Sequence, residues 1–155
     1  MLLTDILALE CIKPRMRATD KASAIAELVD LVCAAGKVTD REQMLQATLA
    51  REATRTTGIG SGLAIPHGKC AAAKELVMAI GRPARPIDFD SIDGQPVSII
   101  IFLASPPDKT GPHIQALARI SRHMSDERFR QALLEAPGAE DIYKLIAEWE
   151  AKLGD

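Results

Sequence analysis

The chain has 155 residues, of which 47% are hydrophobic and 26% charged, and its formal net charge is −2. This length and composition are typical of one soluble globular domain with a sizeable core. The near-neutral charge and the lack of Lys/Arg runs argue against nucleic acid or an anionic membrane as a partner. No apolar run approaches the roughly 18 residues of a membrane-spanning helix, and no charged leader precedes a hydrophobic segment. We therefore expect a cytoplasmic protein without membrane insertion.

The cysteines indicate neither a disulfide framework nor a zinc site. They are few and widely spaced: Cys11, Cys33 and Cys70. Cys70 lies three residues after His67, a spacing that suits two metal ligands on a helical turn, but no second ligand pair accompanies them. We expect three reduced thiols, no metal and no other cofactor.

The N-terminal part predicts a lead-in followed by a helix. Residues 1–17 are rich in leucine and isoleucine and suggest a short helical turn and an edge strand. Thr19 or Asp20 then offers an N-cap. Apolar residues follow at helical spacing, and Gly36 is a natural C-terminal stop.

A second helix is predicted from the capping-box pattern Thr39-x-x-Glu42 to about Arg51 or Ala53. Met44, Leu45 and Leu49 are expected to face inward from it.

Three later segments read as strands. They cover residues 63–65, 75–81 and 97–104, and a proline-rich connection over 82–96 contains an Asp93-Gly94 turn signal. The third segment is an almost unbroken apolar run, which favours a strand buried on both faces of a sheet covered by helices.

The C-terminal part predicts three helices. The first starts near Pro112, a residue favoured in a first turn, and the second follows a cap at Asp126. The last follows Pro137-Gly138 and carries a clear amphipathic stripe. On the first of these helices one apolar face is expected: Ile114, Leu117, Ala118, Ser121 and Met124. The element order predicts a single α/β domain with a mixed β-sheet and helices packed in layers.

One glycine-rich stretch stands out after the second helix, and it includes the predicted strand over residues 63–65. It runs Thr-Thr-Gly-Ile-Gly-Ser-Gly-Leu-Ala-Ile-Pro-His-Gly-Lys from Thr56 to Lys69. Its glycine spacing fits neither a dinucleotide fingerprint nor a P-loop. Pro66 and Gly68 flank His67, so the backbone is rigid before the histidine and conformationally free after it. The hypothesis is that His67 is a nucleophile; the alternative is a structural or solvated histidine.

Other polar residues have both functional and structural interpretations. His113 follows Pro112 at a helix start, where partial positive charge disfavours imidazolium; it is either a neutral donor to an anion or a plain polar residue. Arg51 either complements the end of its helix or holds a phosphoryl group. His123, ten positions beyond His113, does not share its face and is expected at the surface. Arg55 and Lys69 are also expected there.

These residues together resemble the signature of EIIA domains of the bacterial phosphotransferase system, fructose/mannitol type. The resemblance rests on Arg51-Glu52, the stretch 56–69 and two later segments, 86–97 and His113-Ile-Gln-Ala-Leu. It covers essentially the whole chain, so we expect one EIIA type-2 domain over residues 1–155. The single-domain length most resembles the nitrogen-regulatory branch. Where some members of that branch carry a further histidine, this chain has Gln115.

The resemblance implies a phosphocarrier whose mixed sheet has helices on both faces. His67 corresponds to the phosphorylated histidine, which receives a phosphoryl group on Nε2 from HPr or its nitrogen-branch paralogue, fed by Enzyme I from phosphoenolpyruvate. His113 falls on the second active-site histidine and Arg51 on the family's arginine. Because phosphoryl transfer depends on positioning and charge, backbone amides around Gly60, Ser61 and Gly62 are candidates for a phosphoryl nest.

Three functions remain open from the sequence. The first is a regulatory phosphocarrier that acts on nitrogen, potassium or carbon metabolism by binding target proteins according to its phosphorylation state. The second is a sugar-specific EIIA that passes phosphate to an EIIB for fructose or mannitol uptake. The third is a docking module without phosphotransfer. An apolar and acidic rim near His67 is the expected docking surface, and the sequence is compatible with a homodimer.

Overall fold

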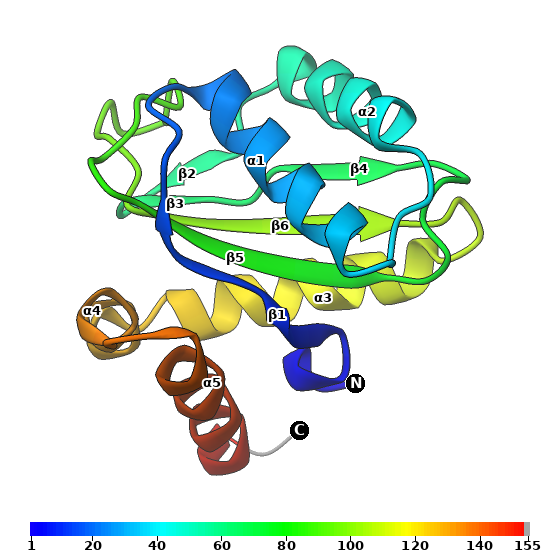
Figure 1. Cartoon of the computed structure of the whole chain (residues 1–155). Helices are drawn as coiled ribbons and strands as arrows, with labels where there is room; N and C mark the ends of the chain where they lie inside the picture. The colour runs from blue at the N-terminus through cyan, green and yellow to red at the C-terminus, as the bar shows by residue number, and fades with distance from the viewer. Residues whose placement is uncertain (154–155) are drawn as a thin grey trace.

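Six strands form one mixed sheet, and helices cover both of its faces (Figure 1). The computed structural model describes residues 1–153, so the expected domain range of 1–155 ends two residues outside the described part. The strand order is β1-β5-β6-β3-β2, with β4 also paired to β6. The strands are β1 (Leu7–Met16), β2 (Gly58–Gly60), β3 (Leu63–Ala64), β4 (His67–Lys69), β5 (Val77–Pro83) and β6 (Ile99–Ser105). The predicted fold class is confirmed.

The central strand β6 organises the core. All seven of its residues are buried, and their side chains alternate between the two hydrophobic clusters of the protein. Ile100 and Phe102 face one cluster, and Ile101 and Leu103 face the other. This confirms that the apolar run over 97–104 is a strand covered on both faces, because a strand with water on one side would alternate apolar and polar residues.

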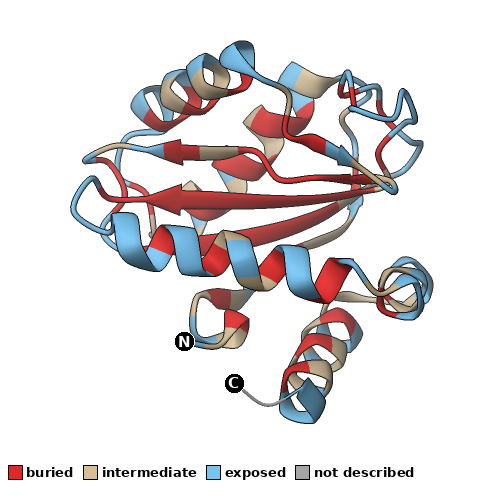
Figure 2. Ribbon diagram, turned by 180° about the vertical axis from the view of Figure 1, so that it is seen from behind, coloured by how far each residue is buried: buried red, intermediate tan, exposed pale blue. Residues whose placement is uncertain are grey.

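Two helices lie on one face of the sheet and three on the other (Figure 1). The first pair is α1 (Lys21–Ala34) and α2 (Arg41–Thr54), and the second set is α3 (Thr110–Met124), α4 (Glu127–Glu135) and α5 (Ala139–Leu153). Figure 2 shows the central strands β5 and β6 mostly buried and the outer helix faces exposed. No helix within residues 1–153 combines the length and hydropathy required to cross a bilayer.

The helix boundaries largely follow the predicted caps. Asp20 caps α1 by accepting a hydrogen bond from the Ser23 N–H, and Gly36 follows its end with φ of 76°. The capping box at Thr39 is wrong, because Asp40 caps α2 instead. The Thr39 N–H and hydroxyl both donate to the Ala72 carbonyl, so the Thr39 side chain bonds to a neighbouring loop instead of capping α2.

The buried face of α3 differs from the predicted one. Ile114 is 60% exposed, whereas His123, expected at the surface, is 1% exposed. The residues that face the core are His113, Ala116, Ile120, His123 and Met124. These residues have helical spacing. Both histidines of α3 point inward, because the buried face of a helix is wide enough to include residues ten positions apart, one near each edge.

A buried carboxylate lies beside His123. Glu150 of α5 accepts hydrogen bonds from the backbone N–H of Leu3 at 2.6 Å and of Thr4 at 3.3 Å. His123 Nε2 lies 3.6 Å from the same carboxylate. The first turn of the chain is thus joined to α3 and α5 at their shared edge of the molecule.

Candidate functional site

His67 lies immediately after an interruption in the strand that runs along one side of β6. β3 pairs in parallel with the start of β6, and β4 pairs with its end. The intervening Ile65-Pro66 breaks the ladder, because Pro66 has no N–H to donate. The break separates β4 from β3 and places the imidazole at the start of β4.

Gly68 allows α2 to pack directly on β4. A Cβ at this position would lie 2.4 Å from Thr48 Oγ1 and 2.9 Å from Met44 Sδ, closer than real Cβ contacts. Its φ is not positive, in contrast to the glycines of the preceding turn. The glycine after His67 therefore serves close helix packing rather than backbone bending around a bound group.

A hydrogen bond fixes the tautomer of the His67 ring. Nδ1 lies 2.9 Å from the Ile65 carbonyl oxygen, which can only accept, so Nδ1 carries the proton. Burial lowers the pKa of His67 below 6.5, and the nearby Arg51 cation lowers this pKa further, whereas the Ile65 carbonyl raises it. At neutral pH the ring is uncharged, and its Nε2 holds the free lone pair that a nucleophile requires.

His113 packs edge-on against His67. The two ring centroids are 5.2 Å apart and the ring planes make an angle of 67°. His113 is 5% exposed, and its Nδ1 is buried without a hydrogen-bond partner in the structure. Burial lowers the pKa of His113 to about 4, and His67 and Lys69 contribute further. The predicted neutral state thus has burial as its main cause, rather than the position at the helix start.

The lowered pKa of His113 makes folding stability depend on pH. Between about pH 6.5 and 4 this histidine binds a proton in the unfolded chain but stays neutral in the folded one. The contribution of neutral His113 to the free energy of unfolding is therefore complete above pH 6.5 and is lost as the pH falls towards 4. We expect His113→Gln to reduce the acid-induced loss of unfolding free energy by about 2 kcal/mol. Urea unfolding of both proteins at several pH values measures this difference. Parallel pH profiles would contradict it.

Arg51 and Lys69 both place positive charge near His67. Arg51 Nη1 donates to the Arg55 carbonyl at 3.1 Å and to Thr54 Oγ1 at 3.3 Å, which is the predicted structural role at the end of α2. Lys69 Nζ donates to Thr110 Oγ1 at 3.0 Å and so joins β4 to the start of α3. Lys69 and Arg55 are exposed, as expected.

A groove of about 280 Å³ opens beside His67. Arg51 lines it, which brings the predicted cation to the histidine site. The remaining lining residues are Arg55, Thr56, Thr57, Ile59, Ile65, Ile92, Leu117 and Ser121. Ile92 is 66% exposed and Ile59 45% exposed. Since none of these lining residues is acidic, the groove has an apolar and basic wall, and the apolar and acidic docking rim stays a prediction.

Residues 5–149 match the family model described as "Phosphoenolpyruvate-dependent sugar phosphotransferase system, EIIA 2". The chain belongs to this EIIA-2 family. The match covers the histidine pair, Arg51 and the glycine-rich stretch, so the resemblance stated from the signature residues is confirmed at the level of the family.

Relatives of this EIIA chain include both regulatory and sugar-specific proteins. A nitrogen regulatory protein of Bradyrhizobium diazoefficiens is 36% identical over 149 residues, which cover 95% of each chain. A fructose-specific EIIA component of Haloferax volcanii is 36% identical over 146 residues, 94% of this chain and 95% of the relative. The fructose-specific EIIABC component of Bacillus subtilis is also 36% identical, but the chain spans only 23% of its length.

Solved structures agree with the fold. The nitrogen regulatory protein IIA-Ntr of Neisseria meningitidis has a TM-score of 0.82 at 31% identity and covers 93% of this chain and 98% of its own. The mannitol IIA of Escherichia coli has a TM-score of 0.77 at 22% identity, with 90% and 97% covered, and at that identity it supports the fold alone.

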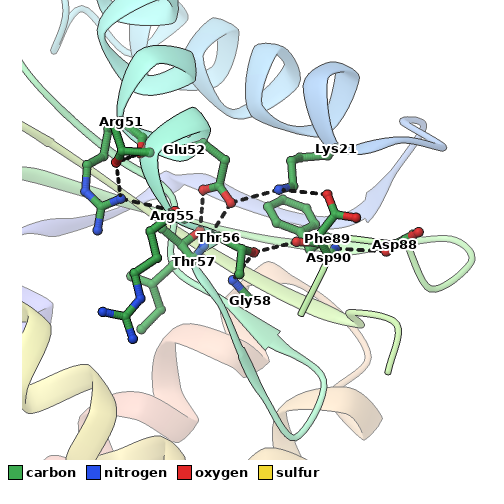
Figure 3. Close-up of polar contacts among 12 residues, drawn as sticks. Lys21, Arg51, Glu52, Arg55, Thr56, Thr57, Gly58, Asp88, Phe89 and Asp90 are labelled. Atoms are coloured by element: carbon green, nitrogen blue, oxygen red, sulfur yellow. Dashed lines mark hydrogen bonds and ion pairs between the residues drawn. The ribbon is translucent and has the colours of Figure 1, made fainter. Parts of the chain in front are cut away.

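A polar network behind the site of this EIIA chain involves residues whose role the sequence does not reveal (Figure 3). Glu52, which is 7% exposed, accepts from the Thr57 N–H at 2.8 Å and from the Thr57 hydroxyl at 2.6 Å. Lys21 Nζ lies 3.1 Å from the same carboxylate. Glu52 belongs to the signature pair Arg51-Glu52, but its contact with Lys21 of α1 is a tertiary contact that no local pattern indicates.

The turn at Gly60, Ser61 and Gly62 lies away from the histidine pair. It joins β2 to β3 with φ values of 102°, 58° and 77°, and the Ser61 N–H donates to Asp93 Oδ2 at 3.1 Å. Leu63 is aligned with Ile99 of β6, whereas His67 is aligned with Leu103. That separation is roughly 13 Å along the strand. The phosphoryl nest stays a prediction. For the Ser61 N–H to bind a phosphoryl oxygen, it would have to break its hydrogen bond to Asp93.

Proposed function

We propose that this EIIA chain is a phosphocarrier that accepts a phosphoryl group on Nε2 of His67 from the phosphohistidine of an HPr-type carrier. The observation that carries the proposal is the hydrogen bond from Nδ1 to the Ile65 carbonyl, which leaves the Nε2 lone pair free. A neutral ring of fixed direction is what a histidine nucleophile requires.

The proposed step exchanges one N–P bond for another. The Nε2 lone pair attacks phosphorus as the donor's N–P bond breaks, and that bond pair stays on the donor imidazole. Positive charge develops on the His67 ring, and the Ile65 carbonyl stabilises it through the Nδ1–H it already accepts. Neutral His113 donates a hydrogen bond to the phosphoryl oxygens, and Arg51 supplies charge from the groove.

The groove supports a proposed docking site for the carrier beside His67. Its exposed isoleucines, Ile59 and Ile92, offer apolar contact next to His67, and Arg55 offers a positive charge at the rim. A protein partner that brings its own phosphohistidine into line with Nε2 would bury these side chains.

Incubation with phosphoenolpyruvate, Enzyme I and an HPr-type carrier tests the proposal. We expect the intact mass to rise by one phosphoryl group, and acid to remove this group because an N–P bond is acid-labile. No mass change with a competent carrier would contradict the proposed function and would favour a docking module without phosphotransfer.

The His113→Ala variant is expected to fold but to accept phosphate on the order of a hundredfold more slowly, because one donor to the developing phosphoryl charge is lost. Quenched-flow labelling by the phosphorylated carrier measures the rate, and circular dichroism checks the fold. An unchanged rate would remove His113 from the proposed mechanism.

Regulation through phosphorylation-dependent binding of target proteins is the function we favour beyond phosphate acceptance, because relatives of matching length include nitrogen regulatory proteins. A sugar-specific role is the second candidate, because the fructose-specific EIIA relative is equally similar. One fold neighbour, the mannitol IIA of Escherichia coli, was solved in complex with phosphorylated IIB. Rapid phosphate transfer from this chain to a purified fructose or mannitol EIIB would favour the sugar-specific role.

A further inference from the structure

The buried carboxylate of Glu52 is the only acidic side chain among the described residues of α2 that lies inside the protein. Burial of a carboxylate is costly unless its oxygens are paired and hydrogen-bonded. Both oxygens of Glu52 have partners: Thr57 donates its N–H and its hydroxyl, and Lys21 of α1 approaches from the other side. Lys21 Nζ also lies 3.4 Å from Asp90 and 5.4 Å from the centre of the Phe89 ring.

The contacts of Thr57 continue to the histidine ring. The Thr57 carbonyl accepts from the Ile65 N–H at 3.0 Å, and the Ile65 carbonyl accepts from His67 Nδ1 at 2.9 Å. Glu52 therefore fixes Thr57 on its amide and hydroxyl side, while Ile65 bonds to the carbonyl side of the same residue. Figure 3 shows the first part of this path, with Glu52 directed at Thr57 and Lys21 beside it.

We propose that Glu52 is a positioning residue for His67, acting through Thr57 and Ile65 to aim the carbonyl that holds Nδ1–H and thus to direct Nε2 into the groove. The proposal rests on the proposed role of His67 as phosphoryl acceptor. It assigns the carboxylate a role in the reaction without contact with the phosphoryl group.

The charge of Glu52 acts on the same ring. It raises the pKa of His67, and so opposes the effects of burial, Arg51 and Lys69, which lower that pKa. A side chain that only closed the end of α2 would have no reason to change the tautomer of His67 or the rate at which it accepts phosphate. These two properties separate positioning from plain structural support.

The experiment compares Glu52→Gln with Glu42→Gln, which removes an exposed carboxylate from the first turn of the same helix. Long-range ¹H–¹⁵N NMR of the unphosphorylated proteins reports the tautomer and pKa of His67, and labelling by the phosphorylated carrier reports the rate. In Glu52→Gln we expect a lower His67 pKa, a smaller share of the Nδ1–H tautomer and a rate reduced on the order of tenfold. Glu42→Gln should match the wild type in all three.

Thr57→Val provides a second variant with the carboxylate intact, because it removes only the hydroxyl bond to Glu52. We expect a several-fold loss of rate and a shift of tautomer in the same direction. If either folded variant loses thermal stability while the tautomer, pKa and rate of His67 stay unchanged, Glu52 is structural and the proposal is wrong. The NMR measurements need no phosphorylation, so they test the proposal even if the wild-type chain accepts no phosphate.

Discussion

His67→Ala is expected to abolish phosphate uptake from the phosphorylated carrier, with a loss of at least about a thousandfold in rate. The reason is that the proposed nucleophile is removed, and the proposed role of His113 and Arg51 is to stabilise charge on the phosphoryl group rather than to attack phosphorus. The ring is half-buried and contacts His113, so the fold should survive its truncation. Intact-mass analysis after incubation with phosphoenolpyruvate, Enzyme I and carrier measures the outcome.

The control for this variant is His113→Ala, which removes the other ring of the pair. It should still reach one phosphoryl group per molecule, only more slowly. If His67→Ala were labelled to the same extent as the wild type, phosphate would reside on another residue and the proposed mechanism would fail.

Glu150→Ala is expected to lower the free energy of unfolding by about 3 kcal/mol. The carboxylate is 2% exposed and accepts a 2.6 Å hydrogen bond from the buried Leu3 N–H. Truncation leaves this donor and that of Thr4 without their acceptor and opens a cavity between the first turn, α3 and α5. Urea denaturation at neutral pH measures the change.

Glu148→Ala is the matched control, because it removes an exposed carboxylate two positions earlier on α5. Its effect should stay within about 0.5 kcal/mol. Glu150→Gln, which retains an acceptor oxygen, should fall between the two. Equal stability of Glu150→Ala and Glu148→Ala would mean that the chain termini are not held by this carboxylate.

Elements with strong local signals could be predicted from the sequence. The apolar run of β6 and the cap at Asp20 both depend on short segments, and the structure has them within two residues. The short strands β2 and β4 could not be predicted, because their glycines give no alternation of apolar and polar residues. They exist because their neighbours, β3 and β6, offer backbone partners.

The orientation of α3 shows the limit of periodicity. Its apolar residues fall on more than one stripe, so the face with Ile114 was as reasonable as the face that is buried. The buried face is set by packing against other elements, since His123 lies against Phe129 of α4 and 3.6 Å from Glu150 of α5. Similarly, the signature includes Glu52, but its contact with Lys21 depends on how α1 and α2 pack.

The most direct test of the account is to identify the nitrogen that carries phosphorus. The chain, labelled with ¹⁵N-histidine, is phosphorylated by the carrier and studied by ³¹P–¹⁵N and ¹H–¹⁵N NMR. Because Nδ1 donates to the Ile65 carbonyl, we predict that phosphorus is bonded to Nε2 of His67 and that Nδ1 keeps its proton. Phosphorus on Nδ1 of His67, or on any other residue, would contradict the account.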